Sequence, residues 1–428
     1  MVVSSIRRIP PCRRFPLPAA PRPSRSPSAP PRPSSPSPSP AHSIRPPARW
    51  PRPPGPEPRI AINATNTPGD GNSLFKITQP GSYYLTGNIT GVPNKHGIEI
   101  TSSGVTVDLM GFDLVGVPGM GAFDGVSVTV GSISGITVRH GSVRNWGGDG
   151  IDLGTNPTSN TVSDIGSIGN AGNGIKVGSN CLISKCVASS NTLSGISTGS
   201  NCSISECTAS TNDAHGISTG LMCTINNCTA PSNALVGIDA GSSNRINGCT
   251  ASGNTTGFQT DFAATISNCT AYNNAERGIE AGSGSTISGC TADANRTDGI
   301  YADRSTIVNC TARLNTRNGI SVFAYCLIQS NTTVSNGYLT GDGAGIHTVS
   351  GSNRIEGNTS TANDRGIEVN FTGNFIVRNI CADNTTNWDV PANNYCLVVL
   401  ATPTTSAITG DSGGLSPGST NPNANFTY

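Results

Sequence analysis

The sequence predicts an all-β protein, built as a single-stranded right-handed parallel β-helix in which each turn of chain adds one rung to a stack. Three observations predict this fold. The pair Gly-Ile recurs at intervals of 20 or 21 residues, short segments alternate between apolar and polar residues, and aromatic residues make up only 5% of the 428 residues. The alternation has a period of two and not 3.6, which favours strands over helices.

The Gly-Ile pairs predict about 13 rungs. The glycines stand at positions 97, 125, 150, 174, 195, 216, 237, 257, 278, 299, 319, 345 and 366, with valine or phenylalanine replacing isoleucine twice. Strands of neighbouring rungs lie about 4.8 Å apart, so 13 rungs predict a rod of roughly 60 Å. Right-handed coiling is expected because crossovers between parallel strands are right-handed in nearly all proteins.

A second column of isoleucines follows each Gly-Ile pair and is expected to face inward, at positions 183, 204, 225, 246, 266, 287, 307 and 328. Three residues after it stand seven cysteines, at 186, 207, 228, 249, 269, 290 and 310, and then Asn331 and Asn358. Because the column continues as asparagine, a stack of buried thiols is favoured. Disulfides between neighbouring rungs remain an alternative, since the rung spacing lies within bonding range, and a metal site is a further alternative.

The composition divides the chain into four segments. Residues 1–59 contain 20 of the 30 prolines and 11 arginines against a single acid, Glu57, and are expected to form a disordered Pro/Arg/Ser-rich arm. Residues 60–96 are expected to form an N-terminal cap and entry strands, 97–380 the β-helix repeats, and 381–428 a C-terminal cap and tail. We identify no secretory signal, and no apolar segment approaches the ~20 residues of a transmembrane span.

The chain resembles the right-handed parallel β-helix repeat proteins of the pectate-lyase-like superfamily over roughly residues 60–400. The resemblance rests on the repeated "G-I-x-x-x…I-x-x-C/N-T-A-x-x-N" pattern and on the opening "ITQPGSYYLTGNIT". It implies a secreted or cell-surface protein that acts on polysaccharides, through Ca²⁺ and a basic residue in lyases or paired carboxylates in hydrolases. No catalytic signature of that superfamily is present, so no catalytic residue can be transferred to this sequence.

The outward positions after each Gly-Ile pair predict an acidic face with one aromatic ring. The candidate catalytic residues on this face are Asp261, Glu280, Asp303, His347 and Glu368. The candidate substrate-binding residues are Asp239, Gln259, Arg277, Tyr301, Tyr338 and Asp342, the last two in an insertion before Ile346. Carboxylates two rungs apart are about 9–10 Å apart, near the ~6.5–9.5 Å typical of inverting glycosidases.

Three of these acids, Asp261, Glu280 and Asp303, are also a candidate Ca²⁺ site, because Ca²⁺ prefers oxygen ligands. No other cofactor is predicted. A second candidate site is the irregular segment "RHGSVRNWGGDG" with Trp146, Asp149 and the nearby Asp152.

Two functions are compatible with these features. The first, which the acidic face with its aromatic ring, the insertion before Ile346 and the resemblance favour, is binding, with or without cleavage, of a polysaccharide along the acidic face. The second is a non-catalytic solenoid for adhesion or structural spacing, which the evenness of the rungs from 174 to 323 favours. For the folded part we expect a monomer with a polysaccharide or glycan surface as partner, no nucleic-acid partner, and an extracellular or cell-surface location.

Overall fold

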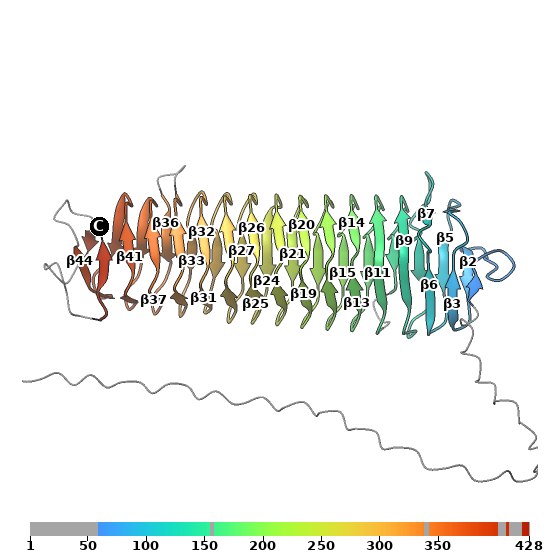
Figure 1. Ribbon diagram of the computed structural model, residues 1–428, viewed down its shortest axis with the longest axis horizontal. Coiled ribbons are helices and arrows are strands. Elements are labelled where there is room, and N and C mark those ends of the chain that lie inside the picture. The colour runs from blue at the N-terminus through green and yellow to red at the C-terminus, as the bar shows by residue number, and fades with distance from the viewer. Residues whose placement is uncertain (1–58, 155–157, 338–341, 401–407, 411–421, 428) are drawn as a thin grey trace, which may run out of the picture. The chain divides into compact units, whose positions relative to one another are not determined.

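The computed structural model describes residues 59–154, 158–337, 342–400, 408–410 and 422–427. These residues form an elongated coil of short parallel strands (Figure 1). Apart from Arg59, the predicted Pro/Arg arm lies outside them. None of the described segments is a helix with the length and apolar character needed to cross a membrane.

The first sheet contains the strands that carry the Gly-Ile pairs or their equivalents, and all of its pairings are parallel. Its strands are β2 (Ser73–Ile77), β5 (His96–Ile100), β8 (Val126–Val128), β10 (Ile151–Asp152), β12 (Ile175–Val177), β15 (Ile196–Thr198), β18 (Ile217–Thr219), β21 (Val236–Ala240), β24 (Thr256–Thr260), β27 (Ile279–Ala281), β30 (Ile300–Ala302), β33 (Ile320–Val322), β36 (Ala344–Thr348), β39 (Arg365–Val369), β42 (Thr386–Val390) and β45 (Ile408–Gly410).

The second sheet consists of two columns of strands. The long strands β9 (Thr137–Arg144) and β11 (Thr161–Ile168) belong to both columns and join them. The first column also contains β1 (Ile60–Ala61), β3 (Gly81–Tyr84), β6 (Val105–Asp108), β13 (Leu182–Ser184), β16 (Ser203–Ser205), β19 (Thr224–Asn226), β22 (Arg245–Asn247), β25 (Thr265–Ser267), β28 (Thr286–Ser288), β31 (Thr306–Val308), β34 (Leu327–Gln329), β37 (Arg354–Glu356), β40 (Phe375–Val377) and β43 (Tyr395–Cys396).

The second column contains β4 (Ile89–Thr90), β7 (Asp113–Val115), β14 (Val187–Ser189), β17 (Thr208–Ser210), β20 (Thr229–Pro231), β23 (Thr250–Ser252), β26 (Thr270–Tyr272), β29 (Thr291–Asp293), β32 (Thr311–Arg313), β35 (Thr332–Val334), β38 (Thr359–Thr361), β41 (Ile380–Ala382), β44 (Val398–Leu400) and β46 (Asn425–Thr427). Each turn of the coil therefore visits the first sheet once and the second sheet twice.

The predicted fold is confirmed, but the predicted number of rungs is too low. The first sheet has 16 strands and not 13. The missing rungs, β2, β42 and β45, have no Gly-Ile pair: Phe75 pairs with Ile98, Trp388 with Ile367, and Ile408 with Trp388. Near both ends of the stack, this position is therefore held by a larger residue, Phe75 or Trp388, or by an isoleucine that does not follow a glycine, Ile408.

The predicted inward columns form the core. The isoleucines of the first sheet and those of the second sheet are completely buried from Ile175 to Ile328. The glycine before each first-sheet isoleucine is explained by close packing. A Cβ atom at Gly278 would lie 2.6 Å from both Asn295 Nδ2 and the Gly299 carbonyl oxygen, a distance that real Cβ atoms do not adopt.

Buried asparagines connect the rungs at the turn that leads into each Gly-Ile pair. Asn274 is representative: its Nδ2 donates to Asn295 Oδ1 (2.9 Å) and to the Ala251 carbonyl (3.3 Å). Its Oδ1 accepts from the Asn254 backbone N–H (3.0 Å). The same bonds recur from Asn170 to Asn363, so this asparagine ladder satisfies buried polar groups of the turn in rung after rung.

The cysteine column is a stack of buried thiols. The seven cysteines of the column form no disulfide and are at most 1% exposed. The Cys228 backbone N–H donates to Cys249 Sγ (3.4 Å), whereas the Cys310 N–H donates to Asn331 Oδ1 (2.8 Å). Thiol and amide thus accept the same bond. Burial raises the pKa of the Cys326 thiol, in a neighbouring column, to about 11, so that this thiol is protonated at neutral pH.

Replacing Cys310 by asparagine is expected to leave stability unchanged to within about 1 kcal/mol. The new side chain would extend the asparagine run by one rung, with the Asn331 oxygen and the Ile287 carbonyl already placed to accept from it. Urea unfolding followed by circular dichroism measures the effect. Cys249→Asn is the matched control. Its neighbours are thiols, so its amide lacks the asparagine partner that position 310 has, and it should unfold at a lower urea concentration than Cys310→Asn.

Candidate functional site

The outward side chains of the first sheet form one continuous column. Strand pairing places them in register, one per rung: Lys76, Glu99, Ser127, Asp152, Lys176, Ser197, Ser218, Asp239, Gln259, Glu280, Tyr301, Ser321, His347, Glu368 and Asp389. Strand pairing therefore brings Asp239, Gln259, Glu280, Tyr301, His347 and Glu368 onto one face, whereas Asp261 and Asp303 follow the ends of β24 and β30. The same column continues upstream through Asp152 of the second candidate site to Glu99 and Lys76, which were not predicted as site residues.

The centre of the predicted face is organised by Arg277. This arginine binds Glu280 (Nη1–Oε1 2.7 Å) and stacks over the ring of Tyr301, with its Cζ 4.1 Å from the ring centroid. Its Nε lies 3.8 Å from the buried carboxylate of Asp298. The guanidinium thus neutralises Glu280 and occupies a face of the aromatic ring that was predicted to bind sugar.

The other predicted acids have different partners. Asp303 binds the neighbouring Arg304 (2.7 Å), and Asp239 lies 4.0 Å from Nδ1 of His215. Burial raises the pKa of Asp239, and the nearby charge of Asp261 adds to this effect, while His215 opposes it. Gln259 is exposed beside Asp239.

The three positions predicted for Ca²⁺ do not converge. Glu280 and Asp303 each bind an arginine, and among the described residues no three His, Cys, Asp or Glu side chains are grouped to hold a metal ion. Ca²⁺ binding by Asp261 with these acids stays a prediction, and no step below depends on it.

His347 and Glu368 are neighbours in register, yet their side chains have other partners. The ring nitrogens of His347 face Asn370 (3.0 Å) and Asn318 (3.5 Å). Glu368 lies 3.7 Å from Arg365, which also binds the exposed Asp342 (3.0 Å) and Asp389 (3.4 Å). Tyr338 lies outside the described residues.

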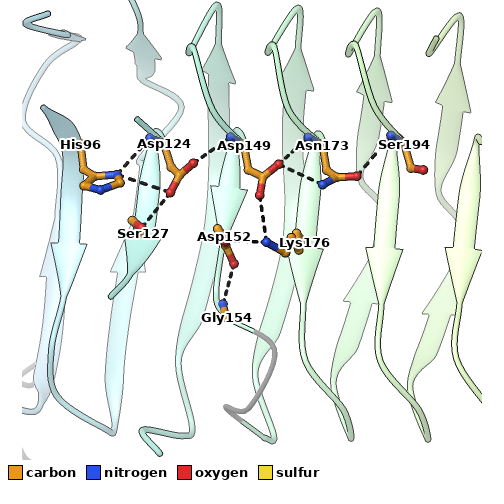
Figure 2. A network of polar contacts seen from close by, with 9 residues as sticks. All are labelled: His96, Asp124, Ser127, Asp149, Asp152, Gly154, Asn173, Lys176 and Ser194. Carbon is orange, nitrogen blue, oxygen red and sulfur yellow. Dashed lines mark hydrogen bonds and ion pairs between the residues drawn. The ribbon is translucent and has the colours of Figure 1, made fainter. Parts of the chain in front are cut away.

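A denser group of titratable side chains lies at the N-terminal end of the same sheet. We call His96, Glu99, Asp124, Asp149, Asp152 and Lys176 the N-terminal polar cluster; the strands and turns from β5 to β12 contribute them. Figure 2 shows most of them converging across successive rungs. Of these, only Asp149 and Asp152 were named in the sequence analysis, as part of the second candidate site.

Asp124 lies at the centre of the cluster, and its carboxylate is 13% exposed. Its Oδ1 accepts from the Asp149 backbone N–H (2.8 Å), and its Oδ2 accepts from Ser127 Oγ (2.8 Å). Burial raises the pKa of Asp124 to about 6, with the charges of Asp149 and Asp152 adding to the rise against these two hydrogen bonds. Asp124 therefore changes its protonation state close to neutral pH, as an acid catalyst requires.

The glycines of "NWGGDG" leave room for this carboxylate. A Cβ atom at Gly148 would lie 2.4 Å from Asp124 Oδ1 and 3.1 Å from the Phe123 backbone. The turn at Gly148 can therefore lie against the Asp124 carboxylate only because residue 148 has no side chain.

Lys176 bridges the other two aspartates. Its Nζ lies 2.9 Å from Asp152 Oδ2 and 3.5 Å from Asp149 Oδ2. Although burial opposes it, the two carboxylates raise the pKa of Lys176, which is therefore a cation at neutral pH. Asp149 Oδ1 also accepts from the backbone and side-chain nitrogens of Asn173 (2.5 and 3.0 Å).

His96 and Glu99 complete the cluster, the first as a neutral ring and the second as an anion. Burial lowers the pKa of His96, and its Nδ1 accepts from the Asp124 backbone N–H (3.0 Å), so the neutral ring carries its proton on Nε2. Burial opposes ionisation of Glu99, but hydrogen bonds from Thr129 (2.5 Å) and Lys76 lower the pKa of the glutamate below its ordinary value.

The carboxylates of Asp124 and Asp149 do more than the fold requires. In the following rung, Asn173 makes the same contact with a neutral amide, since its Oδ1 accepts from the Ser194 backbone N–H (3.2 Å). An asparagine at 124 or 149 would satisfy the turn without burying a charge, and burying a carboxylate costs free energy. Acids at these two positions therefore indicate a role other than stability.

The fold defines the class of this protein: it is a right-handed parallel β-helix. The family model described as "Right handed beta helix region" matches residues 218–360. No curated protein sequence matches the chain.

Several solved structures resemble the coil. The A-module of the Azotobacter vinelandii mannuronan C-5 epimerase AlgE6 is 15% identical, with 74% of this chain and 88% of that chain covered and a TM-score of 0.41. A double mutant of the periplasmic alginate epimerase AlgG is 11% identical, with 75% and 83% covered and a TM-score of 0.43. PfbA, a surface adhesin of Streptococcus pneumoniae, is 11% identical, with 70% and 82% covered and a TM-score of 0.28. Similarity at this level gives no information about activity.

Proposed function

We propose that this β-helix binds a neutral polysaccharide along the outer face of its first sheet and cleaves it at the N-terminal polar cluster. The observation that carries the proposal is the buried acid Asp124, with a pKa of about 6, beside the carboxylate of Asp152 on one exposed face. An acid that holds its proton near neutral pH and a nearby ionised carboxylate are the two groups that glycoside hydrolysis uses.

The roles follow from charge and exposure. Asp124, when protonated, donates its proton to the glycosidic oxygen as the general acid. Asp152 is the more exposed acid, with 20% of its side chain accessible. It acts as the base that takes a proton from the attacking water, whose oxygen bonds to the sugar carbon as the bond to the glycosidic oxygen breaks. Lys176 holds Asp152 in place through the 2.9 Å contact. Because the carboxylates of the cluster outnumber its cations, an uncharged polymer is favoured over a polyuronate.

The central face is proposed to bind the polymer and not to react with it. Glu280, Asp303 and Glu368 each form an ion pair with an arginine, so none of them is assigned the role of the acid. This pairing also favours the second candidate function, a glycan-binding surface protein without catalysis. In either case we propose an extracellular or cell-surface location, where such polymers occur.

A polysaccharide panel tests the proposal, with soluble products measured by mass spectrometry. Wild type is expected to release oligosaccharides from at least one neutral polymer, with a rate that falls as the pH rises through 6 because Asp124 loses its proton. Asp124→Asn is expected to lower kcat by about 10²–10⁴-fold while binding persists, which is the usual contribution of a general acid.

Glu280→Gln is the matched control, since it removes a carboxylate from the same sheet outside the cluster. It should change affinity more than kcat. Cleavage that survives Asp124→Asn would rule out the assigned acid. Binding without any product, equal in wild type and Asp124→Asn, would establish the non-catalytic function instead.

A further inference from the structure

A second surface, near the C-terminal end of the coil, combines exposed aromatic rings with an arginine. We call Tyr325, Arg354, Phe375 and Tyr395 the C-terminal aromatic patch. Arg354, Phe375 and Tyr395 occupy one outward position in the successive strands β37, β40 and β43 of the second sheet. The patch therefore lies on a different sheet from the N-terminal polar cluster and many rungs away from it.

The planar groups of the patch form a stack. The Arg354 guanidinium lies over the ring of Phe375, with its Cζ 4.9 Å from the centroid, and that ring stacks on Tyr395 with centroids 4.5 Å apart and planes 13° apart. A hollow of about 500 Å³ opens beside them, lined by Tyr325, Leu327, Arg354 and Phe375 together with Ser352 and Gly373. This volume lies within the range of sites for small ligands.

These side chains are not required by the coil. In earlier rungs the same outward position is filled by Ser203, Thr224, Arg245, Thr265, Thr286 and Thr306. Tyr325 is 66% exposed and Tyr395 51%, so both leave large rings in water. Tyr325 also has a φ of +54°, where a bulky residue is unfavourable, and the equivalent turn positions of other rungs include Asn201, Ser243 and Ala263 as well as Met222.

The charge of the patch is positive. Glu356 is almost buried and is shared by two arginines, with contacts of 2.6 Å to Arg354 and 2.9 Å to Arg378. One carboxylate between two guanidiniums leaves a net positive charge, and about half of each arginine side chain is exposed. Rings that can stack on a sugar, combined with a guanidinium that can bind a carboxylate, suit a uronic acid unit.

We propose that the C-terminal aromatic patch binds an acidic oligosaccharide, with a sugar ring against Tyr325 and the Arg354–Phe375 pair and a uronate carboxylate on Arg354. The site is independent of the proposed cleavage of a neutral polymer. A β-helix with both sites would hold two different glycans at once, one on each sheet.

Titration calorimetry with oligogalacturonate at low salt tests this site. A neutral cello-oligosaccharide of the same length is the ligand control. Tyr325→Ala and Arg354→Thr are each expected to weaken binding by about ten-fold, as truncation of a binding hot spot does. Both substitutions restore residues that the coil uses at equivalent positions, so folding should be retained and is checked by thermal unfolding.

Met222→Ala and Arg245→Thr are the matched controls, because they introduce the same residues at the equivalent positions outside the patch. They should leave affinity within about two-fold. Asp124→Asn should bind oligogalacturonate like wild type, which separates this site from the proposed catalytic one. The proposal fails if oligogalacturonate does not bind, if the neutral ligand binds equally, or if the controls weaken binding as much. It also fails if sedimentation shows that the patch joins two copies of the chain.

Discussion

Replacing Asn274 by alanine is expected to lower the free energy of unfolding by about 3–5 kcal/mol, a large loss for a single substitution in this chain. The Asn274 side chain accepts from the Asn254 backbone N–H and donates to Asn295 Oδ1 and the Ala251 carbonyl. All of these groups are buried, so water cannot replace the lost amide. The substitution would also leave a cavity, because the amide is completely enclosed.

Urea unfolding measured by circular dichroism, with hydrogen exchange of the neighbouring rungs, checks this result. Asn226→Ala is the control: this asparagine occupies an outward position of β19 beside Ser205 and Asn247, and its loss should cost less than about 0.5 kcal/mol. Equal effects of the two substitutions would mean that the asparagine ladder does not stabilise the coil.

Asp124→Asn is expected to stabilise the protein at pH 7 by about 3 kcal/mol and to have little effect below pH 4. Asparagine is expected to stabilise the protein because the pKa of Asp124 is higher in the folded state than in the unfolded chain. The folded state binds the proton of Asp124 up to about pH 6, whereas the unfolded chain releases it near the ordinary value of 3.8. Stability supplied by the protonated acid is therefore complete below pH 4 and is lost as the pH rises through 6. Asparagine resembles the protonated acid at every pH.

Thermal unfolding of both proteins from pH 3 to pH 8 measures this difference. Asp298→Asn is the matched control. Asp298 directly precedes Gly299 as Asp124 precedes Gly125, and it accepts a hydrogen bond from the backbone N–H of the next rung, that of Asn318 (3.3 Å). The Asp298 carboxylate lies 3.8 Å from Arg277, so removing the charge of Asp298 should lower the stability of the protein. If Asp124→Asn destabilised the protein at pH 7, the carboxylate would be held by favourable contacts, and the argument for an acid catalyst would fail.

The fold could be predicted from the sequence because every rung has the same surroundings. An inward residue contacts its own copies above and below, so one chemical requirement is repeated along the chain as a visible column, such as the isoleucines from Ile183 to Ile328. Towards both ends of the coil this uniformity is lost: among the described strands of the first sheet, β2 pairs with β5 alone, and β42 lies between β39 and the short β45. There Phe75 and Trp388 replace the isoleucine, and the repeat no longer reveals the rung.

The site was harder to predict for two physical reasons. The outward register from Asp239 to Glu368 followed from the even spacing, but the Arg277–Glu280 contact depends on side-chain conformations that the repeat does not determine. Upstream, the spacing between rungs is irregular, so Glu99 pairs with Ser127 at a separation of 28 residues. His96 and Asp124 therefore could not be aligned from the sequence, although the glycine-rich "NWGGDG" indicated an unusual turn nearby.

Because each ladder asparagine binds the asparagine of the next rung, the rungs can form in the order in which the chain is synthesised. In the regular rungs each asparagine binds a partner only 20 or 21 residues further along, so a rung can close as soon as the next one has left the ribosome. The column in which asparagines follow the cysteines ends differently, because its last hydrogen bonds join residues much further apart in the sequence. The backbone and side-chain nitrogens of Asn379 donate to Asn425 Oδ1, 46 residues later. The growing coil therefore keeps an open end until residues 422–427 are made and dock, and a chain stalled before that point would expose an unpaired strand edge to other chains.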